Sequence, residues 1–130
     1  MGGEPPGAVV LDAGALIAIE RLDRRVLAIC DTAQRHDRLV VIPAGVVGQV
    51  WRDGRRQVAI ARLVRARGTL VEVLDADEAC SAGVLCGQAA TADVIDATVV
   101  LAARRHRAPV VSSDRRDIQV LDPHLDVIDC

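Results

Sequence analysis

The stretch AVVLDAGALIAIE, residues 8–20, places one aspartate between a short aliphatic run and an apolar helical segment. Ala8–Leu11 has the composition of a strand that is buried on both faces, and Gly14–Glu20 that of the helix after it. Asp12 therefore stands where a strand ends. In a parallel sheet the carboxyl ends of the strands gather along one edge, and ligands bind in the crevice there.

Two further aspartates also follow short apolar runs, and the three together are spread over about a hundred residues of the chain. Val94-Ile95 leads into Asp96 and the apolar helix 97–103, and the segment 109–113 leads into Asp114. Carboxylates brought to one edge repel each other unless a divalent cation is present, and hard oxygen ligands suit Mg²⁺ or Mn²⁺. The sequence thus predicts a metal site built from Asp12, Asp96 and Asp114.

Strand-like and helix-like segments alternate along the chain. The expected strands are 8–11, 39–42, 70–74, 109–111 and 127–128. The expected helices are 14–20, 24–35, 43–51, 55–66, 75–88 and 114–120. One further helix is expected to be capped by Thr91 and to run through Ala103. This alternation predicts right-handed crossovers and an α/β fold, a three-layer α/β/α sandwich with a mainly parallel sheet. Residues 8–130 are expected to form a single domain after a flexible leader, 1–7.

Composition excludes several classes of function. The chain has one Trp and no Phe or Tyr, which rules out stacking RNA bases on an aromatic sheet surface. All 16 basic residues are Arg, so a Walker-type phosphate loop lacks its Lys, and a phospho-accepting receiver domain is disfavoured for the same reason. The net charge of −2 argues against a general polyanion binder.

Arginines crowd one stretch of the chain, residues 52–67, where Asp53 is the single acidic residue. One interpretation is a solvated helix face. The other is a surface that contacts phosphates or a partner beside the acidic site.

The four cysteines form no C-x-x-C pair and no zinc-ligand spacing, which indicates reduced thiols in a cytoplasmic protein. No leader peptide with a cleavage site and no apolar run approaching 18 residues is found, so neither secretion nor a membrane span is expected.

The motifs in this order resemble the PIN-domain ribonucleases, in particular the toxin of VapBC-type toxin–antitoxin pairs. VVLDAGALIA (9–18) is similar to the family's first-strand signature, with Asp12 as its first acidic residue. A helix that opens with Asp96, followed 18 residues later by Asp114 at the end of a strand, is similar to the family's second half. The middle stretch, 43–68 with its VWRDGRR run, fits as well. The resemblance covers residues 8–128 and implies a PIN-like fold.

One position departs from the family pattern, because Gln49 stands where the family usually places Glu. An amide keeps a carbonyl oxygen as a ligand but lacks the negative charge. Asp53, expected four residues on along the same helical face, or Asp93, three residues before Asp96, would restore a fourth negative charge. Asp93 also has a purely structural interpretation as a helix-dipole partner. For Asp53 and Asp117 we expect solvated charges.

The resemblance implies metal-dependent endonucleolytic cleavage of RNA, with Asp12, Asp96, Asp114 and Asp93 around Mg²⁺ (or Mn²⁺) and Gln49 beside them. A homodimer and a small cognate antitoxin that reaches the acidic groove with an Arg are implied partners. Ser112 or Ser113 is placed to hydrogen-bond a carboxylate or a phosphate. Two rival interpretations remain: a PIN-like RNA- or partner-binding module without turnover, favoured by Gln49, and a receiver-like signalling domain.

Overall fold

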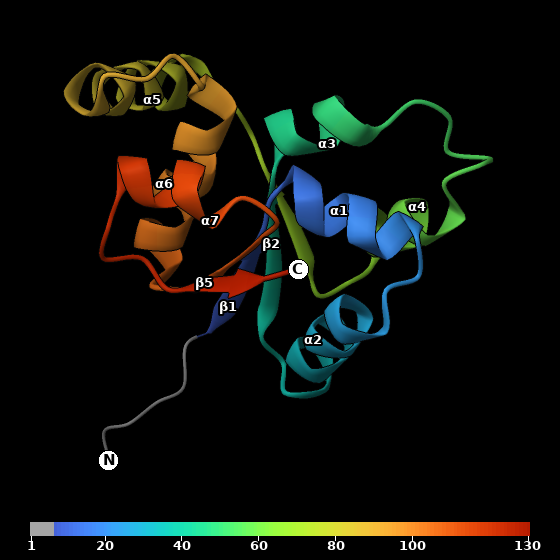
Figure 1. The fold of residues 1–130 in the computed structure, drawn as a ribbon. Coiled ribbons are helices and arrows are strands. Elements are labelled where there is room, and N and C mark those ends of the chain that lie inside the picture. The colour runs from blue at the N-terminus through green and yellow to red at the C-terminus, as the bar shows by residue number, and fades with distance from the viewer. Residues whose placement is uncertain (1–6) are drawn as a thin grey trace.

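The computed structural model describes residues 7–130 and places five parallel strands between two layers of helices (Figure 1). The strands are β1 (Ala8–Leu11), β2 (Leu39–Pro43), β3 (Thr69–Glu72), β4 (Val110–Ser112) and β5 (Val127–Asp129). The helices are α1 (Ala13–Glu20), α2 (Arg24–Arg35), α3 (Ala44–Val50), α4 (Val58–Arg65), α5 (Ala76–Ala89), α6 (Val94–His106) and α7 (Arg115–Leu121). The predicted three-layer α/β/α architecture is confirmed.

The helices divide between the two faces of the sheet. Figure 1 shows α5, α6 and α7 on one side and α1, α2 and α4 on the other. The short helix α3 continues directly from the carboxyl end of β2. Because both faces are covered, β1 is aliphatic along its whole length and all four of its residues are buried.

The strands lie in the order β3-β2-β1-β4-β5, so the chain adds strands on one side of β1 first and then on the other side. The chain moves from β1 outward through β2 to β3, then returns through α5 and α6 to place β4 on the other side of β1. Leu11 of β1 pairs with Val111 of β4, so both strands end at the same level. Such a switch point opens a crevice at the carboxyl ends of the two strands, and open α/β sheets bind their ligands there.

Three local expectations are wrong. The first is the start of α4, which begins at Val58 rather than at residue 55; α3 ends at Val50, about where it was expected to end. Asp53 therefore lies in the connection between the two helices and shares no helical face with Gln49. The cap of α6 is Asp93 rather than Thr91, whose hydroxyl instead accepts a 3.4 Å hydrogen bond from the Asp93 N–H.

The leader predicted over residues 1–7 lies, apart from Gly7, outside the described residues. Among the helices of residues 7–130, no single one is long and apolar enough to cross a membrane; α5 and α6 reach that length and composition only together, across a bend of 104°.

Candidate functional site at the carboxyl edge of the sheet

Aspartates cap several of the helices that begin at the carboxyl edge of the sheet. Asp12 follows β1 and caps α1, Asp114 follows β4 and caps α7, and Asp93 caps α6. Helix α6 ends just before β4 starts, so its own first turn must lie at the far end of that strand, where Asp114 is. Asp96, in this first turn, is thereby brought to the same edge as Asp12.

Asp12 is the buried member of the group, with 6% of its surface exposed. Burial raises the pKa of its carboxyl above the ordinary value, and the negative charge of Asp114 acts in the same direction. Hydrogen bonds from the Ser112 hydroxyl and from the backbone N–H groups of Ala15 and Gly14 oppose this rise. The site therefore holds a desolvated carboxylate by local donors rather than by a cation of the chain.

Ser112 connects the ends of β1 and β4. Its side chain is fully buried, its hydroxyl donates to the Asp12 carboxylate, and its Oγ accepts the Asp114 N–H at 2.9 Å. A single hydroxyl thus ties the positions of two of the three predicted aspartates to each other. The sequence indicated a carboxylate-binding role for Ser112 or Ser113.

Asp96 shows the largest electrostatic effect. Partial burial together with repulsion from other carboxylates raises the pKa of Asp96 to about 7. Asp93 is the strongest of these neighbours, and Asp117 and Asp12 contribute as well. The Asp93 carboxylate also accepts the Asp96 N–H at 2.9 Å, which fixes the start of α6.

Asp117 is the last member of the group and interacts with Asp114. Its hydrogen bond with Asp114 and the charge of Asp114 raise the pKa of Asp117, and Asp93 adds to the effect. The Asp117 N–H also donates to Asp114 Oδ1 at 3.3 Å. Asp117 is exposed, as expected, but it does not stand apart from the site. We call the set Asp12, Asp93, Asp96, Asp114 and Asp117 the acidic cluster.

No member of the acidic cluster forms an ion pair with an Arg or His anywhere in residues 7–130. Elsewhere the structure does pair its acids, as in the 2.8 Å contact between Arg104 and Asp122. Over the described part of the chain, no three Asp, Glu, His or Cys side chains stand close enough together to form a ready metal site. The donors nevertheless fit a hard cation, because every one is a carboxylate and none is neutralised by an ion pair among the described residues.

Gln49 forms no hydrogen bond to the acidic cluster. It lies exposed in the last turn of α3, and its side chain makes no hydrogen bond to the described residues. Asp53 is bound to its own loop, where its Oδ1 accepts the Arg55 N–H at 3.0 Å. The arginine-rich stretch begins in that same loop.

Gly14 is a site residue that the sequence analysis did not single out. An added Cβ would lie 2.1 Å from Ser113 Oγ, 2.8 Å from Ser113 Cβ and 3.0 Å from the Ser113 N. The first turn of α1 thus packs directly on the segment that joins Ser112 to Asp114. The only sequence signal for this contact is a Gly inside an otherwise good helix.

The raised pKa of Asp96 leads to a prediction for chelator-treated protein. Its carboxyl ionises near pH 7 when folded but near 3.8 when unfolded, so the free energy of unfolding should fall as pH rises between these values. Asp96→Asn should therefore be more stable than the parent above pH 7, by on the order of 1 kcal/mol, and nearly equal to it at pH 4. Denaturant unfolding with chelator at several pH values measures this.

The matched control is Asp77→Asn, which removes a carboxylate from the first turn of α5. Asp77 has no part in the acidic cluster, so this change should bring no gain at high pH. A gain for Asp96→Asn that is the same at pH 4 and pH 8 would contradict the electrostatic account.

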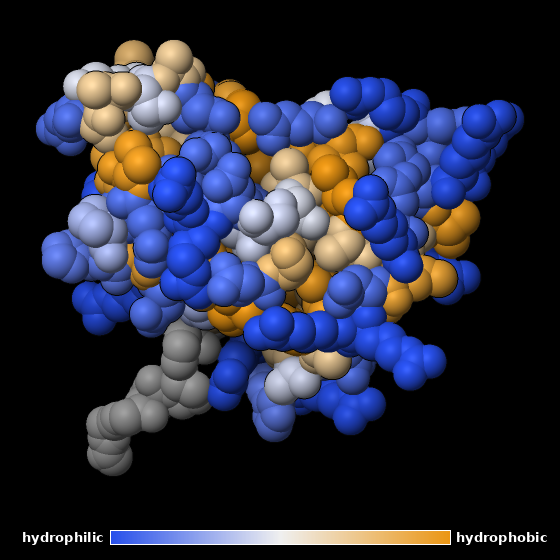
Figure 2. Space-filling model, in the orientation of Figure 1, coloured by the Kyte–Doolittle hydropathy of each residue, from blue (hydrophilic) through white to orange (hydrophobic). Residues whose placement is uncertain are grey.

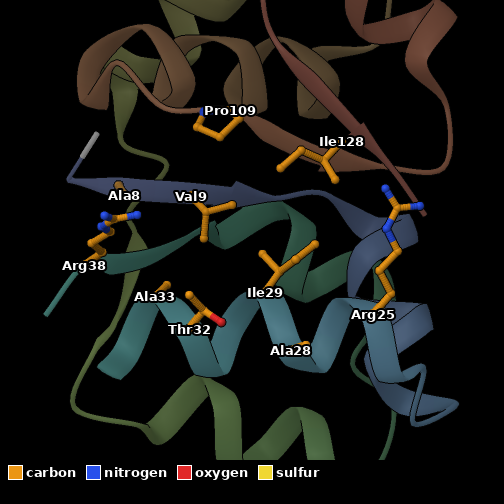
Figure 3. A pocket seen from close by; sticks show the side chains of 10 residues that line it. All are labelled: Ala8, Val9, Arg25, Ala28, Ile29, Thr32, Ala33, Arg38, Pro109 and Ile128. Carbon is orange, nitrogen blue, oxygen red and sulfur yellow. The ribbon is translucent and has the colours of Figure 1, made fainter. Parts of the chain in front are cut away.

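An apolar cleft of about 410 Å³ lies elsewhere, between α2 and the sheet (Figure 3). Val9, Ile29 and Ile128 line its middle, and Arg25 and Arg38 stand at its two ends. None of its lining residues belongs to the acidic cluster. The candidate site is therefore the open carboxyl edge of the sheet and not this cleft.

No protein-family model and no curated protein sequence matches the chain. Among solved structures, FitAB bound to an IR36 DNA fragment matches with a TM-score of 0.61 and 18% identity over 93% of this chain and 94% of that chain. FitAcB from Neisseria gonorrhoeae matches with a TM-score of 0.62 and 17% identity over 93% and 96%. These matches confirm the PIN-like fold that the sequence motifs indicated.

Proposed function

We propose that this protein is a metal-dependent endoribonuclease and the toxin of a toxin–antitoxin pair. The observation that carries the proposal is the acidic cluster, a set of carboxylates without cationic partners at the switch point of a PIN-like sheet. The order of the motifs in the sequence and the shared fold with FitAB and FitAcB support it.

Each residue of the site is proposed to have a role that follows from its position. Asp12, Asp96 and Asp114 are proposed to hold one or two Mg²⁺ (or Mn²⁺) ions, with Asp93 as a fourth negative charge. When bound, such an ion supplies a water of lowered pKa and positive charge beside the phosphoryl oxygens. Ser112 keeps Asp12 and Asp114 in register through its two hydrogen bonds. The N-termini of α1, α6 and α7 direct backbone N–H groups toward the same edge, which favours carboxylate and phosphate alike.

A small cognate antitoxin is the proposed partner. An Arg of that partner would neutralise the acidic cluster, for which residues 7–130 provide no ion-paired cation of their own. The fold is shared with FitAB, which was seen bound to a DNA fragment, and a DNA-bound complex with the antitoxin is proposed here by analogy. A homodimer is proposed on the sequence resemblance alone.

A second candidate function is a PIN-like module that binds RNA without cleaving it. The observation that favours it is Gln49, an uncharged and exposed side chain at the position where the sequence pattern has Glu. The two functions differ in a single measurable property, turnover.

Cleavage of total RNA at millimolar Mg²⁺ or Mn²⁺ tests the proposal, with chelator as the control. We expect fragments that appear only with the metal. If RNA is bound but stays intact with either metal, the nuclease proposal fails and the binding module replaces it.

If residue 49 is the missing negative ligand of a weakened metal centre, Gln49→Glu should tighten Mg²⁺ binding about tenfold, or about 1.4 kcal/mol, because it adds a negative charge to the site. A Mg²⁺ titration of RNA cleavage measures the change, with Gln34→Glu as the control of equal charge, since Gln34 lies against Gly68 at the amino ends of the strands. If Asp93 already supplies the fourth charge, Gln49→Glu will have no effect and Asp93→Asn will be damaging instead.

A further inference from the structure

The connection between α3 and α4, residues 51–57, projects from one corner of the molecule (Figure 1). Its sequence, WRDGRRQ, carries three arginines and one aspartate. Figure 2 shows that the same corner, at the upper right of the view, is covered with hydrophilic side chains. We call residues 51–57 the arginine loop.

The loop is closed at its base by one buried side chain, that of Gln57, which is only 7% exposed. Gln57 Oε1 accepts the N–H groups of Arg52 at 2.8 Å and of Asp53 at 3.0 Å. Its Nε2 donates to the carbonyl of Val50 at 2.9 Å. These bonds satisfy the backbone where α3 stops, and they hold residue 57 out of α4. A buried amide with three backbone partners fixes a conformation strongly, because each partner would otherwise be left unpaired.

Further contacts hold the remainder of the loop. The carbonyl of Asp53 accepts the N–H groups of Arg56 and Gln57, both at 3.0 Å. Gly54 lies against the Trp51 ring so closely that a Cβ would come within 2.7 Å of Cζ2. The loop therefore has a defined shape despite its exposed position.

The three arginines do different things. Arg52 Nη1 donates to the carbonyls of Gly48 and Trp51 and so completes the end of α3. Arg56 is 89% exposed at its side chain and touches Asp53 only at 3.9 Å. The Arg55 guanidinium makes no hydrogen bond or ion pair with the residues described. Arg55 and Arg56 thus present free donors on a rigid support.

The loop stands at the same end of the molecule as the acidic cluster. Helix α3 begins beside α6, where a Cβ on Gly45 would meet Ile95 Cδ1, and Ile95 precedes Asp96. The seven residues of α3 then span roughly 10 Å before the loop starts. A polynucleotide strand bound at the acidic cluster can reach the loop within a few nucleotides.

We propose that Gln57 is a positioning residue that holds Arg55 and Arg56 against the phosphate backbone of single-stranded RNA beside the acidic cluster. The choice of RNA rests on the proposed function. Guanidinium groups match phosphate oxygens with forked pairs of donors. A loop that is already ordered loses little entropy on binding.

The first test measures binding of a labelled single-stranded RNA by fluorescence anisotropy, in chelator, across a range of salt. Arg55→Ala/Arg56→Ala should weaken binding about tenfold and make the slope of log affinity against log salt shallower by about 1.4, since two phosphate contacts are lost. The control is Arg38→Ala/Arg67→Ala, which removes the same charge beside the amino ends of β2 and β3. Equal binding by both double variants overturns the proposal.

The second test shows whether Gln57 acts through the arginines. Gln57→Met, which keeps the size but removes all three hydrogen bonds, should weaken RNA binding severalfold in the parent and add nothing in the Arg55→Ala/Arg56→Ala background. Gln34→Met, at the amino ends of the strands, is the control. An equal loss in both backgrounds overturns the positioning role. Should Gln57→Met fail to fold in a thermal melt, Gly54→Ala displaces the loop from Trp51 and is judged by the same cycle.

These measurements separate the inference from the proposed function because they need no turnover. Loop-dependent RNA binding by a protein that cleaves nothing would leave the inference standing and remove the nuclease. Metal-dependent cleavage with binding that is indifferent to the loop would do the reverse.

Discussion

Asp12→Asn, Asp96→Asn and Asp114→Asn should each lower RNA cleavage at least a hundredfold, or about 2.7 kcal/mol of transition-state stabilisation. Each change removes one negative charge from the acidic cluster, where a cation is proposed to act. The protein should stay folded, because Asp12 and Asp114 are helix N-caps and Asn caps a helix about as well as Asp. Initial rates at fixed Mg²⁺ measure the effect.

The control is Asp126→Asn, an exposed aspartate just before β5, at the opposite edge of the sheet. It should cleave like the parent. Near-normal turnover for any one of the three variants would remove that residue from the site, and a thermal melt of each variant separates lost catalysis from lost folding.

Gly14→Ala should destabilise the protein by about 1–3 kcal/mol, the usual cost of overpacking a filled space. Helix propensity alone predicts the opposite, a gain of about 1 kcal/mol for Ala over Gly inside a helix. Packing should win, because the new Cβ meets the Cβ and the backbone N of Ser113 and not merely the end of a flexible side chain. Urea unfolding decides the sign.

Gly83→Ala in the middle of α5 is the matched control, since nothing lies within 4 Å of its Cβ position. It should be neutral or stabilising. Cleavage by Gly14→Ala should fall as well, because relief of the clash shifts the segment between Ser112 and Asp114. Unchanged stability of Gly14→Ala would mean that this segment yields freely and does not fix the distance between Asp12 and Asp114.

Local pattern alone determined most of the architecture. The short aliphatic runs and the helical periodicity between them specify the strands and most helices, because burial on both faces leaves no other composition for a central parallel strand. The positions of Asp12 and Asp114 at strand ends, and of Asp96 near the start of a helix, were likewise readable. Asp12 and Asp114 converge because every parallel strand ends at the same edge, and Asp96 joins them because α6 starts at that edge before it returns to β4.

Contacts between distant segments decided the rest. Asp93 and Asp117 become neighbours only because the sheet has β1 in its middle, and no local sequence signal shows this. Nor does any local signal show that Gly14 must leave room for Ser113. Helical spacing suggested that Asp53 shares a face with Gln49, but the buried amide of Gln57 takes the backbone N–H groups of residues 52 and 53 and ends the pattern there. Periodicity reports the preferences of neighbouring residues, whereas hydrogen bonding and repulsion depend on which groups the completed fold brings within a few ångströms.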